Sequence, residues 1–512
     1  MNASPLRRER LWDGFALLLA LVGFLASAQV TFRIFEAIPH IEDEMAYTWQ
    51  ARLIARGFTL TIPTPPCPNC FLVPFVVDAH GQRSSKYPPA WSVVLALGER
   101  LGARAWVNPF LAGLSVWLIY RLGKRLLNAP TGALAALFTV ISPFFLMNSG
   151  SLLNHPWALF LTLAFTLAWL DAFFPSRIPA WLSLPTAGLS MGLLALTRPL
   201  TAVGVALPFA VHALIILWRG DARRRWRLLL FGGIAGAVSL LYFVWQYAVT
   251  GDPFLNPYLL WWEYDKIGFG PGVGVREGGH TLVQAWFHTR FSVGVGSHDL
   301  MGWVYLSYLF FPFGLIALRR RPQAFLPVGV MLALVAVYNL YWTPAWLYGP
   351  RYYYEGLPGA MLLNAAGVCW LAGWVTGKGR AVRWGWENRL GLAGLAFTVM
   401  FLCAANVSLY LPIRLSMLVG LYDVRASDLA LFLSPEAQKM PPTLVIVYPQ
   451  RKWIEYGRLL DLSSPLFDSQ FVFTIDRGEI LNQEVIQFFP GRLVWHYTPG
   501  VTRLTPVSDD AP

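Results

Sequence analysis

Twelve apolar segments follow one another along this 512-residue chain, and they constrain its fold more than any other feature. Only 13% of the residues are charged, whereas a soluble domain has about 25%. One segment, Pro89–Leu101, is too short to cross about 30 Å of hydrocarbon as an ordinary helix. The sequence therefore predicts an all-α polytopic membrane protein with about eleven spans and one short or re-entrant segment. The segments are Trp12–Val30, Pro89–Leu101, Ala105–Tyr120, Thr131–Met147, Pro156–Phe174, Pro179–Thr197, Leu200–Trp218, Leu228–Val249, Leu300–Leu318, Phe325–Trp342, Leu357–Val375 and Leu390–Leu411.

Basic residues gather in the short loops between these segments. The net charge of +12 would suggest a nucleic-acid partner in a soluble protein. Here the positive-inside rule explains it, so we expect no nucleic-acid binding, a cytoplasmic N-terminus and a multi-pass protein of the cytoplasmic membrane. The expected cytoplasmic clusters are Arg7–Arg10, Arg121–Arg125, Arg223–Arg227, Arg319–Arg321 and Lys378–Arg389. The expected outside pieces are Thr31–Pro88, Asn148–His155, Thr250–Asp299 and the chain after Leu411.

The chain changes character after residue 411. Three short apolar runs, Thr443–Tyr448, Phe471–Ile475 and Arg492–Tyr497, are typical of buried strands, and the stretches between them favour helices. We therefore expect a transmembrane domain over residues 1–411, with 31–88 as its first outside loop. Residues 412–512 are expected to form a small extracytoplasmic α/β domain. No glycine-rich turn follows the first of these strands, which argues against a dinucleotide site.

Three consecutive carboxylates, Glu42–Glu44, stand in the first outside loop close to the membrane. The apolar residues that follow have helical spacing, which predicts a short amphipathic helix that ends near Gly57. One interpretation makes Asp43 the N-cap of this helix, with Glu44 in the first turn favoured by the helix dipole. The other makes Asp43 a general base whose pKa is raised by partial desolvation at the water–lipid boundary.

Lys86 stands just before the second apolar segment, within Ser84-Ser85-Lys86-Tyr87-Pro88-Pro89. A cation in this position suits a phosphate at headgroup depth, or it is a lysine that extends to the interface from the end of a span.

Two cysteines, Cys67 and Cys70, share the same loop. A local disulfide is one interpretation; a redox pair and half of a metal site are the others.

Several short motifs resemble those of the GT-C membrane glycosyltransferases, in particular glycosyltransferase family 39, which includes protein O-mannosyltransferases and aminoarabinose transferases. The motifs are Asp43-Glu44 with Tyr47, Lys86-Tyr87-Pro88-Pro89, Asn108-Pro109, Asn154-His155-Pro156, Thr197-Arg198-Pro199 and Gly349-Pro350-Arg351-Tyr352-Tyr353.

This resemblance implies transfer of a sugar from a polyprenyl-phosphate donor to an acceptor lipid, glycan or protein at the extracytoplasmic face, with inversion. It makes Asp43 the base and Glu44 its partner at the acceptor. Lys86 and Arg351 become the phosphate ligands, with Arg198 as a weaker third. Lys86 and Arg351 should then converge on Asp43. Further candidates for acceptor or lid contacts are Tyr47, Tyr87, His155, Asp299 and Tyr352.

No cofactor or metal is expected, because cationic side chains can stabilise the leaving phosphate. Some relatives carry an acid where this chain has Asn154-His155, which leaves the sugar and the acceptor open. Two other functions remain open. A transporter or lipid flippase would place polar groups at mid-membrane, whereas a non-catalytic membrane assembly protein would use the C-terminal domain for docking.

Overall fold

The computed structural model describes residues 5–375, 386–500 and 505–506. Most of the basic cluster predicted at Lys378–Arg389 therefore lies outside the described residues. Over the described part, the chain folds into two compact units. Unit 1 comprises the described residues of Met1–Val30, Asn108–Tyr242 and Tyr264–Met417, and unit 2 comprises those of Thr31–Val107, Phe243–Glu263 and Leu418–Pro512.

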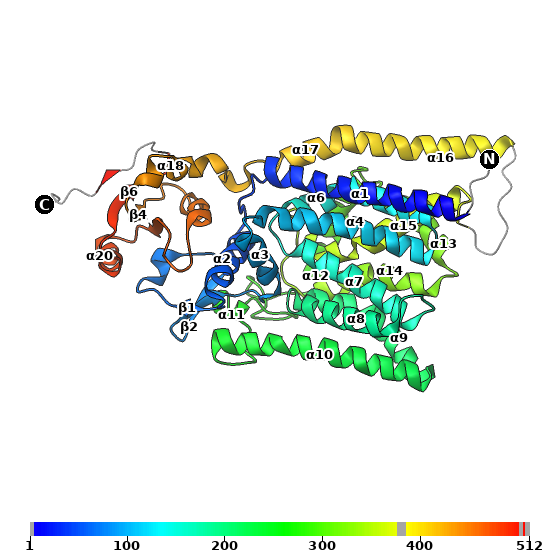
Figure 1. Ribbon diagram of the computed structural model, residues 1–512, viewed down its shortest axis with the longest axis horizontal. Helices are drawn as coiled ribbons and strands as arrows, with labels where there is room; N and C mark the ends of the chain where they lie inside the picture. The colour runs from blue at the N-terminus through cyan, green and yellow to red at the C-terminus, as the bar shows by residue number, and fades with distance from the viewer. Residues whose placement is uncertain (1–4, 376–385, 501–504, 507–512) are drawn as a thin grey trace. The chain divides into compact units, whose positions relative to one another are not determined.

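Unit 1 is built from helices. Among them α7 packs against α8 (Figure 1). In addition, α9 packs against α14, and α15 packs against both α5 and α13. A Cβ atom on Gly314 of α13 would lie 2.2 Å from the Leu363 carbonyl oxygen of α15, so glycine permits this close helix contact. The helices are α1 (Pro5–Arg33), α4 (Val107–Leu126), α5 (Ala129–Val140), α6 (Pro143–Gly150), α7 (His155–Phe173), α8 (Ala180–Ala195), α9 (Pro199–Arg219), α10 (Ala222–Thr250), α12 (Leu282–Asp299), α13 (Phe311–Leu318), α14 (Phe325–Tyr338), α15 (Leu357–Leu371), α16 (Trp386–Ala405) and α17 (Leu411–Ser416).

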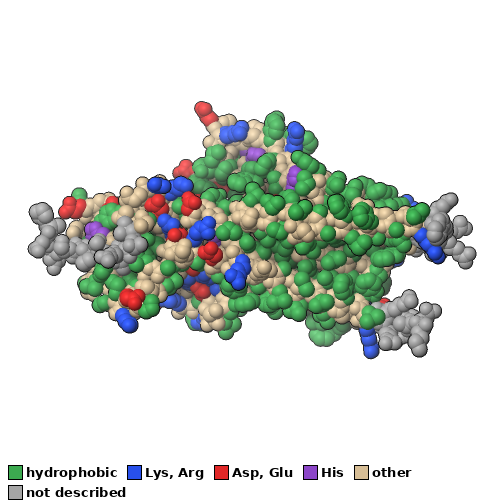
Figure 2. Space-filling view, turned by 90° about the horizontal axis from the view of Figure 1, so that it is seen from above, with side chains coloured by type: hydrophobic (Ala, Val, Ile, Leu, Met, Phe, Trp, Pro, Cys, Tyr) green, Lys and Arg blue, Asp and Glu red, His purple; other side chains and the backbone are tan. Residues whose placement is uncertain are grey.

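The helices present an apolar surface suited to lipid. Hydrophobic side chains cover much of the face shown in Figure 2. Five helical stretches in the described ranges are long and apolar enough to cross a membrane, or six if α5 and α6, bent by 61°, count as one broken span. The chain is thus a mostly helical protein with several helices long and apolar enough to cross a membrane, and the larger predicted number of about eleven stays a prediction.

One predicted span is wrong in its position. Only Phe311–Leu318 of the expected Leu300–Leu318 is α-helical. Gly302 and Tyr305 have φ values of +66° and +61°, which a right-handed helix does not tolerate. The preceding stretch, expected to be an outside loop, contains α12 instead, which begins with a capping box between Thr281 and Gln284.

Unit 2 carries the first loop and the C-terminal residues. The loop forms α2 (Glu42–Gly57), a three-stranded antiparallel sheet, and α3 (Ala90–Arg100), whose shortness agrees with the prediction for this segment. The strands of this sheet are β1 (Ile62–Pro63), β2 (Val76–Ala79) and β3 (Gln82–Ser85). A second sheet has the order β5-β4-β6-β7, with β4 (Thr443–Val447) parallel to β5 (Phe471–Ile475) and β6 (Leu493–Tyr497), and β7 (Thr505–Pro506) antiparallel to β6. The three strands predicted here are confirmed.

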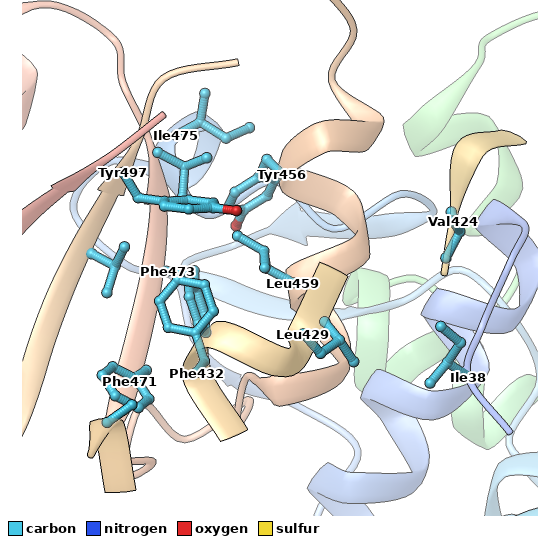
Figure 3. Close-up of a cluster of buried hydrophobic side chains, with 13 residues drawn as sticks. Ile38, Val424, Leu429, Phe432, Tyr456, Leu459, Phe471, Phe473, Ile475 and Tyr497 are labelled. Atoms are coloured by element: carbon cyan, nitrogen blue, oxygen red, sulfur yellow. The ribbon is translucent and has the colours of Figure 1, made fainter. Parts of the chain in front are cut away.

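The C-terminal residues and the first loop share a hydrophobic core. Phe432, Phe471, Phe473 and Tyr497 meet edge to face in this core, and Ile38 of the first loop belongs to the same cluster (Figure 3). The predicted domain boundary at residue 411 stays a prediction, but the core shows that the second sheet is packed together with the first loop.

The disulfide between Cys67 and Cys70 is present. Both cysteines are buried in a hydrophobic cluster with Leu444, Val472 and Val485. The pair therefore stiffens the first loop where it packs on the second sheet.

Candidate functional site

The carboxylates of the first loop have different roles. Helix α2 begins at Glu42 with Ile41 as its N-cap, so Asp43 is not the cap residue. Glu44 is buried, and its Oε2 accepts hydrogen bonds from the backbone N–H groups of His40 at 2.8 Å and Ile41 at 3.3 Å. Glu44 therefore stabilises the start of the helix. These hydrogen bonds give no support to its expected role at the acceptor.

Asp43 is partly exposed, and its Oδ1 accepts a hydrogen bond from the Tyr87 hydroxyl at 2.5 Å. The Tyr47 ring lies 4.6 Å from the Tyr87 ring, between centroids. Burial, together with the negative charge of Asp43, raises the pKa of Tyr87 well above its usual value, so the phenol stays protonated and keeps donating. A neutral donor thus orients the Asp43 carboxylate without removing it from solvent.

Lys86 is surrounded by aromatic rings. Its side chain is only 2% exposed. The Nζ atom lies 3.9 Å from the ring centroid of Phe75, 4.8 Å from Tyr258 and 4.9 Å from Trp262. These rings come from segments far apart in the sequence, and their faces attract an ammonium group in a dry environment. The structure therefore buries the cation instead of extending it from the end of a span.

A second polar cluster lies in unit 1 around Arg198. Pro199 at the first position of α9 disfavours helical backbone at the preceding residue, and Arg198 has φ −146° and ψ 83°. Its Nη1 lies 2.7 Å from Nδ1 of His155, and its Nη2 donates to the Tyr338 hydroxyl at 2.9 Å. Arg198 was expected to be a secondary cation, yet it is the centre of this network.

Glu355, in the short 3-10 helix η4 (Arg351–Gly356), completes this cluster. It is 1% exposed, and its Oε1 lies 3.7 Å from Nε of Arg198 and 3.8 Å from Nδ1 of His155. Burial raises the pKa of Glu355 to about 7, although the Arg198 charge lowers it. Sequence reasoning missed this residue. The usable signal was a single acid at the entrance to an apolar segment, which is costly without a role.

Arg351 and Tyr352 belong to the same region of unit 1. The guanidinium carbons of Arg351 and Arg198 each lie 5.9 Å from the Tyr352 ring centroid. Tyr352 also stacks on Tyr338, with 4.6 Å between ring centroids. The two predicted arginines thus lie around one aromatic ring.

Asp299, expected as an acceptor or lid residue, is buried at the end of α12. It accepts hydrogen bonds from the Tyr410 hydroxyl at 2.7 Å and from Nε of Arg414 at 3.0 Å. These contacts tie α12 to α17 and to the short π-helix before it (Asn406–Tyr410), and they give no support to a lid role.

The structure therefore brings the predicted residues together in two groups. Asp43, Tyr47, Lys86 and Tyr87 form the acid–lysine cluster of unit 2. Arg198, His155, Arg351 and Tyr352, with Glu355 added, form the arginine cluster of unit 1. The expected convergence of Arg351 with Lys86 and Asp43 stays a prediction.

The chain is similar to known lipid-dependent transferases. Residues 87–261 match the family model described as dolichyl-phosphate-mannose-protein mannosyltransferase. This region includes Tyr87, His155 and Arg198. A curated protein from Edwardsiella ictaluri, undecaprenyl phosphate-alpha-4-amino-4-deoxy-L-arabinose arabinosyl transferase, is 27% identical over 255 residues. The match covers 43% of this chain and 43% of the relative's length.

Solved structures show the same fold. ArnT from Cupriavidus metallidurans, in a crystal structure bound to undecaprenyl phosphate, aligns with a TM-score of 0.59 and 13% identity over 95% of this chain and 89% of that one. The Archaeoglobus fulgidus oligosaccharyltransferase in its apo form aligns with a TM-score of 0.52 and 14% identity, over 87% of this chain and 63% of that one. The expected resemblance to GT-C glycosyltransferases of the family 39 group is thereby confirmed, and the fold of this chain is the one that ArnT has.

Proposed function

We propose that this protein transfers a sugar from a polyprenyl-phosphate donor to an acceptor at the extracytoplasmic face of the membrane, with inversion of the anomeric carbon. The proposal is supported by the likeness to transferases whose names specify undecaprenyl-phosphate or dolichyl-phosphate donors. The observation that carries it is the acid–lysine cluster, because it joins an accessible carboxylate and a buried cation through Tyr87 in one compact unit.

Asp43 is the base in this proposal. It accepts the proton of an acceptor hydroxyl or amine while that group bonds to the anomeric carbon and the bond from this carbon to the phosphate oxygen breaks. The bonding electron pair leaves with the polyprenyl phosphate. Attack and departure on opposite faces of one carbon invert its configuration. The Tyr87 hydrogen bond holds the Asp43 carboxylate in one orientation during this step.

The cations stabilise the phosphate as it gains charge. Lys86 is already desolvated among aromatic rings, so its interaction with a phosphate is weakly screened. Arg351 and Arg198 are the proposed second and third ligands, which requires the arginine cluster to face the same donor. A divalent metal is not part of the proposal.

The proposed orientation places the first loop and the small α/β domain of residues 412–512 outside the cytoplasmic membrane. This orientation rests on the basic residues in the short loops that are expected to face the cytoplasm, according to the positive-inside rule. The acceptor class, whether lipid, glycan or protein, is left open.

The test is a transfer assay with purified protein in lipid bilayers, a panel of radiolabelled polyprenyl-phosphate sugars, and an envelope extract as the source of acceptors. We expect one donor to lose its label to an acceptor, and NMR of the product to show the inverted anomer. A flippase or an assembly protein would leave the label on the donor, and a product of retained configuration would also contradict the proposal.

A further inference from the structure

A polar cleft of about 450 Å³ opens in unit 2, outside the acid–lysine cluster. It lies between the ends of α2 and α3 and the segment that follows Asp461. Three arginines and two acids line it, together with two serines. The lining residues are Arg52, Ala55, Arg56, Glu99, Arg100, Asp461, Leu462, Ser463 and Ser464.

The two acids of the cleft are already neutralised. Nε of Arg52 lies 2.6 Å from Oε1 of Glu99, and its Nη2 lies 2.9 Å from Oδ1 of Asp461. Arg104 also pairs with Asp461, with 2.7 Å between Nη1 and Oδ1. The positive charge that faces an incoming ligand therefore comes from Arg56 and Arg100.

These two arginines keep donors available. Within the described chain, Arg100 makes a single hydrogen bond, from Nε to the Ala55 carbonyl oxygen at 2.7 Å, and no ion pair. Nη1 of Arg56 pairs with Asp468 and donates to the Ser464 hydroxyl at 3.1 Å, which leaves its other nitrogens for a ligand; Arg56 and Asp468 are both half exposed, and such surface pairs are weak. The Ser463 hydroxyl is buried and has no hydrogen-bond partner among the residues that the structure describes. Guanidinium and hydroxyl donors without acceptors are suited to a phosphate.

Exposed apolar side chains adjoin these donors. The guanidinium carbon of Arg100 lies 3.8 Å from the ring centroid of Phe58, which is 76% exposed. Leu97 and Leu101, on the last turn of α3 and just after it, are 59% and 80% exposed. Basic residues next to exposed apolar residues on short helices are typical of segments that lie in the membrane interface.

We propose that this cleft binds the phosphate headgroup of an anionic lipid. Arg100, Arg56 and Ser463 donate to the phosphate oxygens, and the exposed Phe58 ring and α3 leucines contact the acyl chains. A free inorganic phosphate would use the donors alone and would leave these apolar residues in water. The site is independent of the proposed transfer reaction, since no residue of the acid–lysine or arginine cluster lines it.

The test uses the full chain in detergent and measures the binding of dioctanoyl phosphatidylglycerol by calorimetry, with dioctanoyl phosphatidylcholine and glycerol 1-phosphate as separate ligands. Each arginine near a membrane surface contributes about 1 kcal/mol, so Arg100→Gln should weaken phosphatidylglycerol binding about fivefold and R56Q/R100Q about 25-fold. Arg451→Gln is the matched control, because Arg451 is an exposed arginine of unit 2 that does not line the cleft. Arg451→Gln should bind phosphatidylglycerol with the same affinity as the unchanged protein.

Ser463→Ala tests the same site without changing charge, and it should also weaken phosphatidylglycerol binding. This variant keeps the test decisive if the arginine variants prove unstable. Phosphatidylcholine and glycerol 1-phosphate should bind at least tenfold more weakly than phosphatidylglycerol. The proposal is overturned if R56Q/R100Q and Ser463→Ala both bind phosphatidylglycerol like the unchanged protein. Equal binding of glycerol 1-phosphate and the lipid would also overturn it, since the cleft would then hold a soluble anion.

Discussion

Replacing Lys86 by methionine should separate its role in transfer from its role in packing. Methionine keeps the length and most of the volume of the side chain but removes the ammonium group. A hydrogen bond from a charged donor contributes about 1.5–3 kcal/mol, so its loss should lower kcat/KM for the lipid-linked donor about 10- to 150-fold.

Folding stability should change far less. The ammonium is attracted by the rings of Phe75, Tyr258 and Trp262, by about 2 kcal/mol for a desolvated cation. Burying that charge costs a comparable amount, which methionine avoids. We therefore expect the free energy of unfolding to change by only about 1 kcal/mol.

The assay compares kcat/KM and the thermal midpoint for the unchanged protein, Lys86→Met and Lys452→Met. Lys452 is an exposed lysine of unit 2 whose ion pair with Asp423 is also exposed, so its variant should behave like the unchanged protein. If Lys86→Met transfers within threefold of normal, Lys86 is not a phosphate ligand. If instead both activity and folding are lost, its role is structural.

Three further predictions concern carboxylates with low exposure, and thermal unfolding in detergent checks each of them. Glu44→Ala should destabilise the protein by about 1–3 kcal/mol, because two backbone N–H groups lose their acceptor. The pKa of Glu355 is raised from 4.5 to about 7 by burial, so its folded form holds the proton more tightly, and stability should fall by roughly 3 kcal/mol as pH rises from about 4.5 through 7. Glu355→Gln should remove this part of the fall, and an unchanged pH profile would contradict the reasoning. Burial alone would raise the pKa of Asp461, but Arg104 and Arg52 hold it at about 2, so its stabilisation is present above pH 3.8 and lost as pH falls through 2. Asp461→Asn should therefore cost roughly 2 kcal/mol at neutral pH, since the partly buried guanidinium groups of Arg104 and Arg52 lose their charged partner.

Local patterns predicted local structure well. The apolar runs at 443–448 and 471–475 are strands, because their residues have the β-branched and aromatic composition that a buried sheet favours. For Cys67 and Cys70 the sequence left a local disulfide, a redox pair and half of a metal site open, and the structure has the disulfide.

Contacts between distant segments could not be predicted in the same way. No local pattern shows that Trp262 lies beside Lys86, or that the Glu44 carboxylate turns back to the backbone before α2 instead of toward a substrate. The sequence made Arg198 a weaker candidate than Arg351 as a phosphate ligand. The short motifs around these arginines do not show which side chains each one contacts. The helical segment at 300–318 was misplaced because Tyr305, a non-glycine residue, adopts a positive φ that its composition does not indicate.

The central claim is that Asp43 removes the acceptor proton, and single-turnover transfer by Asp43→Asn tests it most directly. Asparagine keeps an oxygen that can accept the Tyr87 hydrogen bond but cannot take up the proton. We expect transfer to fall about 10²- to 10⁴-fold, while donor binding and the thermal midpoint stay close to normal. Transfer by Asp43→Asn at the rate of the unchanged protein would contradict the account, because a different group would then have to act as the base.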